Sequence, residues 1–558
     1  MAVLNLLAES DGVLQRHLSD SKRNAKYTSK TVQNEMIQLM GDFIRDEGTK
    51  DLRDGDALFS LIADEVTDIS NKEILSLCVR FVSSSHNIQI QEIFLDFVSL
   101  EGITGELITK AIIETLKKHR IDITKCRGQC YDGASSMSSE KVGVQCRIRE
   151  YSETAFYTHC NSHVLNLSVA ASCKLPPVRN MVDSINEIYL IFSNSPKRQR
   201  VFEAFIEHST LSSKAKKLKG LCKTRWVERH LCFDTMYELF GAICSTYEYI
   251  LDPKSIEIDN AELPVEWDRE TRVKAQGLLS VMKSSSFLVA FVTVKNVLEI
   301  IKPLTVKLQK RDIDIVDAYN LIDSTKREVK DLRARIGNED FSVWFKDAEH
   351  LATVANSLIT TPRLAGKQRY RANAECSNAE EYFLRNVAIP FCDFISSKLA
   401  TRFSEDNRAG KAMFSLLPKS VVKVDISDTL EGLSTWDNDL QSPSSLRHEI
   451  SAWKRKWSTI ETIDSKYDNM IGCLTEIDGD VFPNLQKLFV IGCTLPVTSC
   501  EAERSFSVHK RTKTYLRSTM TEERLSGLAL MNIYPSVQLD IEELTKRFVQ
   551  MHARPIEI

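Results

Sequence analysis

The chain has 558 residues, of which 43% are hydrophobic and 27% charged, a composition typical of globular proteins with about two to four domains at this length. Lys and Arg together number 73 against 76 Asp and Glu, and the net charge of −3 excludes a uniformly basic nucleic-acid coat. No run of about 18 apolar residues is present, so we expect no membrane span. Because the N-terminus lacks the basic start of a secretory signal, the 14 cysteines are interpreted as reduced, buried thiols of an intracellular protein.

The first 100 residues predict helix followed by three strands. Residues 1–50 are expected to be helical, since apolar side chains recur there at helical spacing. A first strand is predicted in "ALFSLIADEVTD", and it ends in acids at Asp64, Glu65 and Asp68. The next two strands, "LSLCVRFV" and "NIQIQEIFLDFVSL", are joined by the short polar link "SSSHN" and are predicted to form a hairpin.

Helices and strands then alternate. "TGELITKAIIETLKKH" is predicted to be an amphipathic helix capped by Thr104, and strands are expected in "ITKCRGQCY" and "AFYTHCNS". This order predicts an α/β fold with a mixed sheet. Residues 180–490 are mostly helical in pattern, and two or three further helices are expected after residue 483.

Acidic residues at two strand ends suggest a metal site. Asp64 ends the first predicted strand and Asp132 follows the fourth, and these two strands lie side by side if the early strands form a hairpin. A third carboxylate from a C-terminal helix would complete a group of hard oxygen ligands for two Mg²⁺ ions, or Mn²⁺. Two such metals support phosphoryl transfer on nucleic acid. Acids at strand ends are also common as plain solvated turn residues, and Asp132-Gly133 is a turn signature.

Cysteine and histidine spacing offers a separate possibility, a structural zinc site formed by Cys126, Cys130, Cys160 and His163. Such a site needs four converging ligands. We do not expect zinc here, because Cys160 is better interpreted as a core residue and His163 as a support for the following helix.

Several motifs together resemble the hAT superfamily of transposases, in particular the subgroup related to zinc finger MYM-type and THAP-type transposase-derived proteins. The motifs, in chain order, are "YTSKTVQNEMIQLM", "LIADEVTDISNKEILSLCVRF", "GQCYDGASSMS", "HCNSHVLNLSV", "KTRWVERH" and "TSCEAERSFSVHKRTKTYLRSTMTEERLSGLALMNIY". The last is similar to the family's C-terminal dimerisation region. The resemblance runs from about residue 10 to residue 535.

The resemblance implies a ribonuclease-H-like core that is interrupted by a large all-α insertion. It identifies Asp64, Asp132 and Glu503 as the catalytic, metal-binding acids. The implied domains are a helical N-terminal segment (1–50), the first part of the core (51–235), a mainly helical insertion (236–485), the dimerisation region that completes the core (486–540) and a tail (541–558).

The same resemblance suggests where DNA binds. Trp226 is expected to stack on unpaired or flipped bases, and basic neighbours are expected to contact the phosphate backbone. These candidates are Lys223, Arg225 and Arg229, with Arg369 and Arg371 in a second basic segment. The structural alternative for Trp226 is a core anchor, and a lysine run is often only a solvated face.

The stretch "VTSCEAERSFS" contains two glutamates that we assign different roles. Thr498-x-x-Glu501 fits a capping box, which makes Glu501 the structural acid. Glu503 faces elsewhere on the helix and corresponds to the third metal-binding acid. Further along, Thr519-x-x-Glu522 is predicted to cap a helix whose apolar stripe packs on its own core or on a second subunit.

Two functions from different classes therefore stand at this point. The first is a nuclear, Mg²⁺-dependent transposase that cleaves and transfers DNA strands and dimerises through its C-terminal region. The alternative is a domesticated nuclear protein that binds DNA or partner proteins without cutting. The three acids favour the first. Transposases of this type usually carry a zinc finger ahead of the core, and the lack of a Cys/His cluster before residue 64 favours the second.

Overall fold

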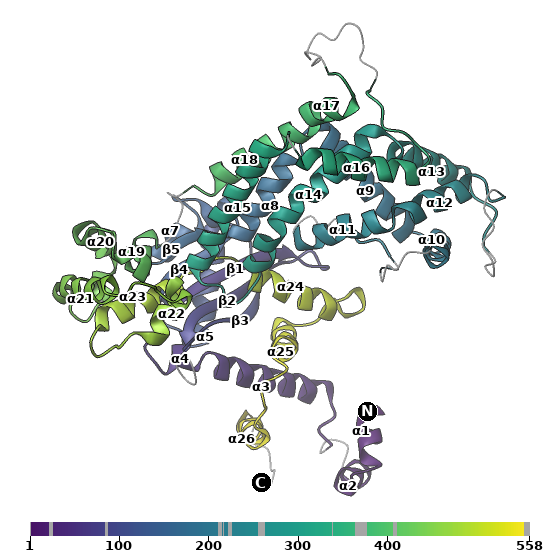
Figure 1. Cartoon of the computed structure of the whole chain (residues 1–558). Coiled ribbons are helices and arrows are strands. Elements are labelled where there is room, and N and C mark those ends of the chain that lie inside the picture. The colour runs from purple at the N-terminus through teal and green to yellow at the C-terminus, as the bar shows by residue number, and fades with distance from the viewer. Residues whose placement is uncertain are drawn as a thin grey trace. The chain divides into compact units, whose positions relative to one another are not determined.

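The computed structural model divides the chain into two compact units (Figure 1). It describes residues 2–21, 26–83, 88–209, 215, 217–220, 226–254, 263–337, 339–362, 376–404 and 410–551, without the side chains of 226–229. The first unit contains Met1–Cys160, Arg311–Asp317 and Arg408–Ile558, and the second contains Asn161–Lys310 and Ala318–Asn407. These boundaries differ from the expected ones, because the helical unit begins at residue 161 rather than 236 and residues 408–485 belong with the sheet.

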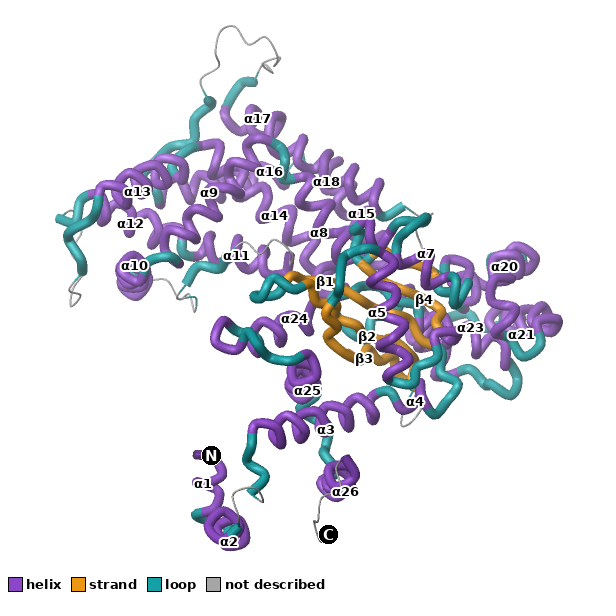
Figure 2. The backbone as a smooth tube through the Cα atoms, turned by 180° about the vertical axis from the view of Figure 1, so that it is seen from behind, coloured by secondary structure: helices purple, strands orange, loops and turns teal. Residues whose placement is uncertain are grey.

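The first unit is built on a five-stranded mixed sheet with the order β3-β2-β1-β4-β5 (Figure 2). Its strands are β1 (Phe59–Thr67), β2 (Glu73–Ser83), β3 (Gln89–Ser99), β4 (Cys126–Tyr131) and β5 (Phe156–His159). The β2–β3 hairpin is antiparallel, β1 pairs antiparallel with β2, and β1, β4 and β5 are parallel. The predicted hairpin and the predicted pairing of the first and fourth strands are thus confirmed.

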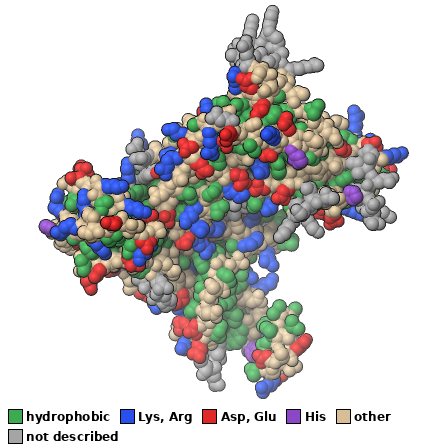
Figure 3. Space-filling view, in the orientation of Figure 1, with side chains coloured by type: hydrophobic (Ala, Val, Ile, Leu, Met, Phe, Trp, Pro, Cys, Tyr) green, Lys and Arg blue, Asp and Glu red, His purple; other side chains and the backbone are tan. Residues whose placement is uncertain are grey.

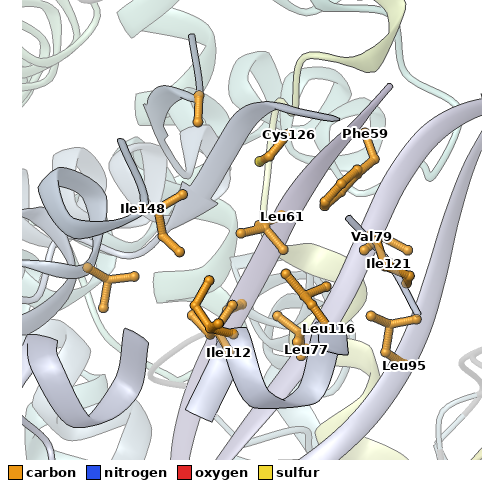
Figure 4. Packing of buried hydrophobic residues seen from close by; sticks show 14 of the residues in the cluster. Phe59, Leu61, Leu77, Val79, Leu95, Ile112, Leu116, Ile121, Cys126 and Ile148 are labelled. Atoms are coloured by element: carbon orange, nitrogen blue, oxygen red, sulfur yellow. The ribbon is translucent and has the colours of Figure 1, made fainter. Parts of the chain in front are cut away.

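Alternation of side chains along the strands builds a core on each face of the sheet. Leu61 and Ala63 belong to one core, shared with α5 (Gly105–Lys118) and α7 (Val144–Arg149). Figure 4 shows this packing at close range. Ile62 points to the opposite face, where the core is shared with C-terminal helices. Because side chains in a strand alternate, Asp64 shares the face of Ile62. Helices on both faces of a mixed sheet confirm the expected ribonuclease-H-like α/β core.

Helices surround this sheet, and Thr104 caps α5 as predicted by accepting a hydrogen bond from the Leu107 amide. The other α-helices of the first unit are α1 (Ala2–Ala8), α2 (Gly12–Asp20), α3 (Lys30–Gly48), α4 (Lys50–Arg53), α6 (Ser135–Ser138), α19 (Pro418–Val421), α20 (Ile426–Leu433), α21 (Leu446–Ser458), α22 (Met470–Glu476), α23 (Pro483–Thr494), α24 (Cys500–Thr512), α25 (Glu522–Ile533) and α26 (Ile541–Met551). Short 3₁₀ turns include η5 (Lys411–Leu416) and η9 (Tyr515–Arg517). The segment expected to be a tail therefore contains a helix.

The first unit also includes a seven-residue strap, Arg311–Asp317, that lies in sequence between two stretches of the second unit. Asp314 is buried and accepts hydrogen bonds from the amides of Val316 (2.7 Å) and Ile471 (2.9 Å). The Asn469 side chain donates to Asp317 at 3.1 Å. The strap is therefore tied to the start of α22.

The second unit is all helical in its described residues. Its helices are α8 (Asn161–Ser172), α9 (Pro176–Ser193), α10 (Pro196–His208), α11 (Trp226–Glu238), α12 (Phe240–Leu251), α13 (Arg269–Met282), α14 (Ser285–Leu308), α15 (Ile315–Arg335, which starts in the strap), α16 (Asp340–Val354), α17 (Ala379–Phe383) and α18 (Ile389–Arg402), with a π turn between the last two. Among the described helices, none is by itself long and apolar enough to cross a membrane. Within the described part of the chain, one pair of helices, α13 and α14, reaches the required length and composition together, and this pair is bent by 67° where the two helices meet.

Candidate functional site: an acidic cluster on one face of the sheet

Asp64 lies near the end of β1 and is opposite Ser76 of β2 in the sheet register. The Ser76 hydroxyl is 2.7 Å from the hydroxyl of Ser505 on α24. This contact fixes α24 over the strands at the level of Asp64. The face that Asp64 shares with Ile62 is therefore the face covered by α24.

Asp132 follows the last residue of β4 and lies on the same face. Cys130 belongs to the α24-side core, so the period of two places Asp132 there as well. Its carboxylate accepts a hydrogen bond from the Ala134 amide at 3.0 Å, and its carbonyl accepts one from the Tyr157 hydroxyl at 3.0 Å. A Cβ on Gly133 would lie 2.6 Å from the His159 ring, so only glycine fits this turn.

Glu503 is in the first turn of α24. The start of that helix is held on the sheet by the Ser499 amide, which donates to the Cys160 sulfur at 3.2 Å. Glu503 is half-buried, as are Asp64 and Asp132. Two adjacent strands and one C-terminal helix thus each contribute one acid to the same face.

The electrostatics of Asp64 indicate that the three carboxylates lie close together. Burial raises the pKa of Asp64 well above its ordinary value, and the negative charges of Glu503 and Asp132 raise it further. Like charges in a poorly solvated place disfavour ionisation of one another. We call Asp64, Asp132 and Glu503 the acidic cluster; a cation would relieve its repulsion.

The acidic cluster has oxygen donors of the kind that Mg²⁺ prefers. As placed here, however, the side chains do not form a metal site. Within the residues that the structure describes, no group of three or more His, Cys, Asp or Glu side chains is arranged to hold a metal ion. The acids supply the type of donor that Mg²⁺ prefers, and the metal assignment stays a prediction.

The other acids of the first strand have different surroundings. Asp68 is bound to Lys513 and also accepts from the amides of Ser70 (2.7 Å) and Lys72 (2.9 Å), so it closes the turn after β1. Although burial opposes it, bonding to Lys513 and these amides lowers the pKa of Asp68. Glu65 points to the other face of the strand, and burial followed by the charge of Asp132 raises its pKa. One of its buried carboxylate oxygens, Oε2, has no hydrogen-bond partner among the residues that the structure describes.

The two predicted capping boxes are wrong. The N-cap of α24 is Ser499, and the N-cap of α25 is Thr521; neither side chain makes a capping hydrogen bond. Glu501 is 1% exposed and instead pairs with Arg311 (2.7 Å) and Arg504 (2.6 Å). It is a structural acid, as predicted, but ion pairs account for this role.

All six predicted DNA-contacting side chains lie outside the part of the chain that the structure describes. This holds for Lys223, Arg225, Arg369 and Arg371, and for the side chains of Trp226 and Arg229 at the start of α11. Their role in DNA contact stays a prediction.

The cysteines considered for zinc are buried thiols. Burial raises the pKa of Cys126 to about 12, and its sulfur donates to the Gly128 carbonyl at 3.2 Å. Burial also raises the pKa of Cys130 well above its usual range, with Cys160 adding to the rise. Raised pKa values disfavour the thiolate form that binds zinc.

Sequence reasoning missed a second charged group on the same face of the sheet, centred on Arg80 of β2. Arg80 is fully buried and pairs with Glu92 of β3 at 2.9 Å. It also donates to the carbonyls of Cys493 (3.2 Å), Arg311 (3.2 Å) and Ile313 (2.7 Å). The signal that could have revealed it is the one charged residue, an arginine, inside the mostly apolar strand "LSLCVRFV".

Two parts of the chain match models of known families. Residues 2–143 match the model described as "ZMYM1/FAM200, RNase-like domain". Residues 470–535 match the model described as "hAT family C-terminal dimerisation region". Both matches agree with the resemblance noted in the sequence, and the second covers α24 and α25.

The chain is also similar to curated proteins over nearly its whole length. A human protein named "52 kDa repressor of the inhibitor of the protein kinase" is 29% identical over an alignment of 556 residues, and the match covers 98% of this chain and 70% of the relative. The mouse protein of the same name is 28% identical over an alignment of 556 residues, and the match covers 98% of this chain and 71% of the relative.

Proposed function

We propose that this chain, a hAT transposase-like protein by these two regional matches, acts in the nucleus as a self-associating protein that binds DNA or partner proteins without cutting DNA. The similarity to proteins named as repressors supports a regulatory role rather than a role in transposition. The observation that carries the proposal is an exposed apolar tip inside the region that matches the dimerisation model.

This apolar tip is η9, the short turn between α24 and α25. Tyr515 is 82% exposed and Leu516 is 90% exposed. Two large apolar side chains held together in water are typical of a protein–protein contact. We propose that the tip is part of the contact between two copies.

The remainder of the dimerisation region packs within its own chain. Leu525 and Ala529 of α25 belong to the core on the α24 side of the sheet. Helix α25 also crosses α3 very closely, since a Cβ on Gly41 would lie 2.7 Å from the Cα of Gly527. Leu525 and Ala529 of α25 are therefore occupied, and the exposed η9 is available to face a partner.

Sedimentation of the full chain tests this proposal. We expect a dimer at micromolar concentration, and we expect the double variant Tyr515→Ser/Leu516→Asp to raise the dissociation constant at least ~10-fold, because hot-spot side chains carry most of an interface's energy. Val343→Asp is the matched control, since Val343 is 59% exposed in the second unit. A wild-type chain that stays monomeric throughout the micromolar range would contradict self-association.

DNA binding is proposed through phosphate contacts. The last turn of α24 carries Lys510 and Arg511, both exposed. Contacts of this kind give affinity that falls steeply with salt and depends little on sequence. Titration of labelled duplexes at several salt concentrations checks this, and binding that is insensitive to salt would exclude it.

One observation favours a second candidate function, metal-dependent DNA cleavage by the acidic cluster. That observation is the raised pKa of Asp64, which burial raises most and the charges of Glu503 and Asp132 raise further. Groups with strongly shifted pKa values often mark functional sites. On this hypothesis Asp64, Asp132 and Glu503 would hold the metal ions.

A nicking assay on DNA hairpins with Mg²⁺ or Mn²⁺ separates the two candidates. The non-cutting proposal predicts no metal-dependent product. Cleavage that disappears in Asp64→Asn and Glu503→Ala but persists in Glu101→Gln, the loss of an exposed carboxylate elsewhere on the first unit, would establish the second candidate instead. Cleavage that survives Glu503→Ala would exclude the acidic cluster as its source.

A further inference from the structure

The first two helices form an apolar arm whose surface is left uncovered. Helices α1 and α2 make their contacts chiefly with each other. Val3 (68%), Leu6 (64%), Leu7 (52%) and Val13 (71%) are all exposed, and α2 has no buried residue. Figure 3 shows hydrophobic side chains gathered on this arm, at the lower right, where Figure 1 labels α1 and α2. An apolar face of this kind is typical of a segment that packs against a partner.

A groove of matching character lies between α3 and the turn that precedes α25. Its volume is about 530 Å³, many times the ~30 Å³ share of one water molecule. Its apolar lining comes from Leu516, Met520 and Leu528. We call it the α3–α25 groove.

The charges of the arm and the groove are complementary. The charged side chains that line the α3–α25 groove are all cationic: Lys30, Arg517 and Arg524. Residues 2–21, which form the arm, contain three acids, Glu9, Asp11 and Asp20, and one arginine. Opposite charges around matching apolar surfaces steer association and fix orientation.

We propose that the arm of one copy docks in the α3–α25 groove of a second copy of this chain, and that the exchange is reciprocal. The proposal rests on the self-association proposed above and adds the segment and the surface that carry it. A second copy is the occupant that these observations favour, because the arm and the groove are both open in a single chain. A two-fold axis then pairs each arm with the other groove.

Chain length sets a geometric limit on this exchange. Tyr27 packs edge-on against Phe548 of α26, with ring centroids 5.9 Å apart, so the chain is anchored there. Six residues, 21–26, connect the end of α2 to this anchor. Fully extended, six residues span about 20 Å. The end of α2 must therefore lie within about 20 Å of its own anchor when the arm docks. The exposed tip Leu516, which also lines the groove, fits this arrangement because it would lie at the contact between the two copies.

Photo-crosslinking of the full chain tests the exchange directly. A benzophenone amino acid replaces Leu6, and irradiation is followed by separation of monomer and dimer and by peptide mapping. We expect crosslinks from position 6 to residues 516–528 in the dimer band. Crosslinks to the same residues confined to the monomer band would show that the arm docks on its own groove, and would overturn the exchange.

Dimer affinity provides the second measurement. We expect Leu6→Asp/Leu7→Asp and Arg517→Glu/Arg524→Glu each to raise the dimer dissociation constant at least ~10-fold, since charge enters an apolar contact or meets like charge. Val265→Asp in the second unit, where Val265 is 62% exposed, is the control and should change nothing.

The failures of the two proposals are distinguishable. A chain that dimerises, with a dissociation constant unchanged by Leu6→Asp/Leu7→Asp, overturns the arm exchange and leaves self-association standing. A chain that is monomeric at every micromolar concentration overturns both.

Discussion

Two charged groups lie on the α24 face of the same sheet, and they are built in opposite ways. The acidic cluster brings together like charges, with Asp64 repelled by Asp132 and Glu503. The group around Arg80 buries a cation with Glu92 and three backbone carbonyls. The second stabilises the fold through its bonds, whereas the like charges of the first disfavour ionisation of Asp64 and cost stability.

Glu501 connects the two groups. It is two residues from Glu503 in α24, yet its carboxylate pairs with Arg311 of the strap, whose own carbonyl accepts from Arg80. The helix that carries the third acid is therefore fastened by the paired group. The ion pairs of Glu501 therefore help to hold Glu503 in its place on the sheet.

The largest predicted effect is on the paired group. Arg80→Met should lower the free energy of unfolding by about 3–5 kcal/mol, because it leaves a buried carboxylate without its partner. Burial already raises the pKa of Glu92 to about 7, against the opposing charge of Arg80. Urea denaturation measures the change, and Arg80→Met/Glu92→Leu should recover part of the loss. A loss below about 1 kcal/mol would show that the buried pair is not essential to the fold.

The next effect should separate the two glutamates of α24. Glu501→Ala should cost about 2–3 kcal/mol, because it removes charge-assisted hydrogen bonds to two arginines from a buried position. Glu503→Ala should leave stability within about 0.5 kcal/mol of wild type or raise it, since like-charge repulsion is removed. Thermal unfolding of the two variants side by side makes the comparison, and equal losses would contradict the division of roles.

Asp68→Asn should cost about 1–2 kcal/mol near neutral pH, since it weakens the bond to Lys513. The pKa of Asp68 is lowered in the folded chain. A lowered acid pKa stabilises the fold above the unfolded value, and that contribution is lost as pH falls through the folded value. The loss in Asp68→Asn should therefore shrink as unfolding is measured at pH values below about 4. A loss that is constant with pH would contradict this ionic role.

The smallest effect should have the opposite sign. Because the pKa of Asp64 is raised in the folded chain, its contribution to stability is present below about pH 4 and is lost as pH rises through the folded value. Asp64→Asn cannot ionise, so it should gain about 1 kcal/mol over wild type near pH 7 and nothing at low pH. Unfolding curves across this range test the sign. A loss of stability at pH 7 would mean that Asp64 has a stabilising partner.

Sequence reasoning captured the parts of the fold that local pattern determines. Apolar patterns predicted β1, β2 and β3. Because β2 and β3 form a hairpin, β1 was expected to lie beside β4, which brings Asp64 and Asp132 to the same part of the sheet. The capping boxes failed because Thr498 and Thr519 lie one and two residues before the actual N-caps, a shift that propensity does not resolve. Most partners of Arg80 and Glu501, among them Cys493, Ile313 and Arg311, lie more than 150 residues away in the sequence. No local pattern contains such contacts.

The strap has a consequence for how this protein can be cut and rebuilt. An inserted helical domain is usually one continuous segment, which the chain enters once and leaves once. Such a segment can be excised and the two ends of the host domain joined. Here the chain returns to the sheet unit for seven residues before it leaves again, so the insertion consists of two separate segments, 161–310 and 318–407. Excising the whole stretch would also remove Asp314 and two of the carbonyls that Arg80 binds. A minimal version of the sheet unit must therefore retain residues 311–317, joined to the rest of the unit by a linker on each side.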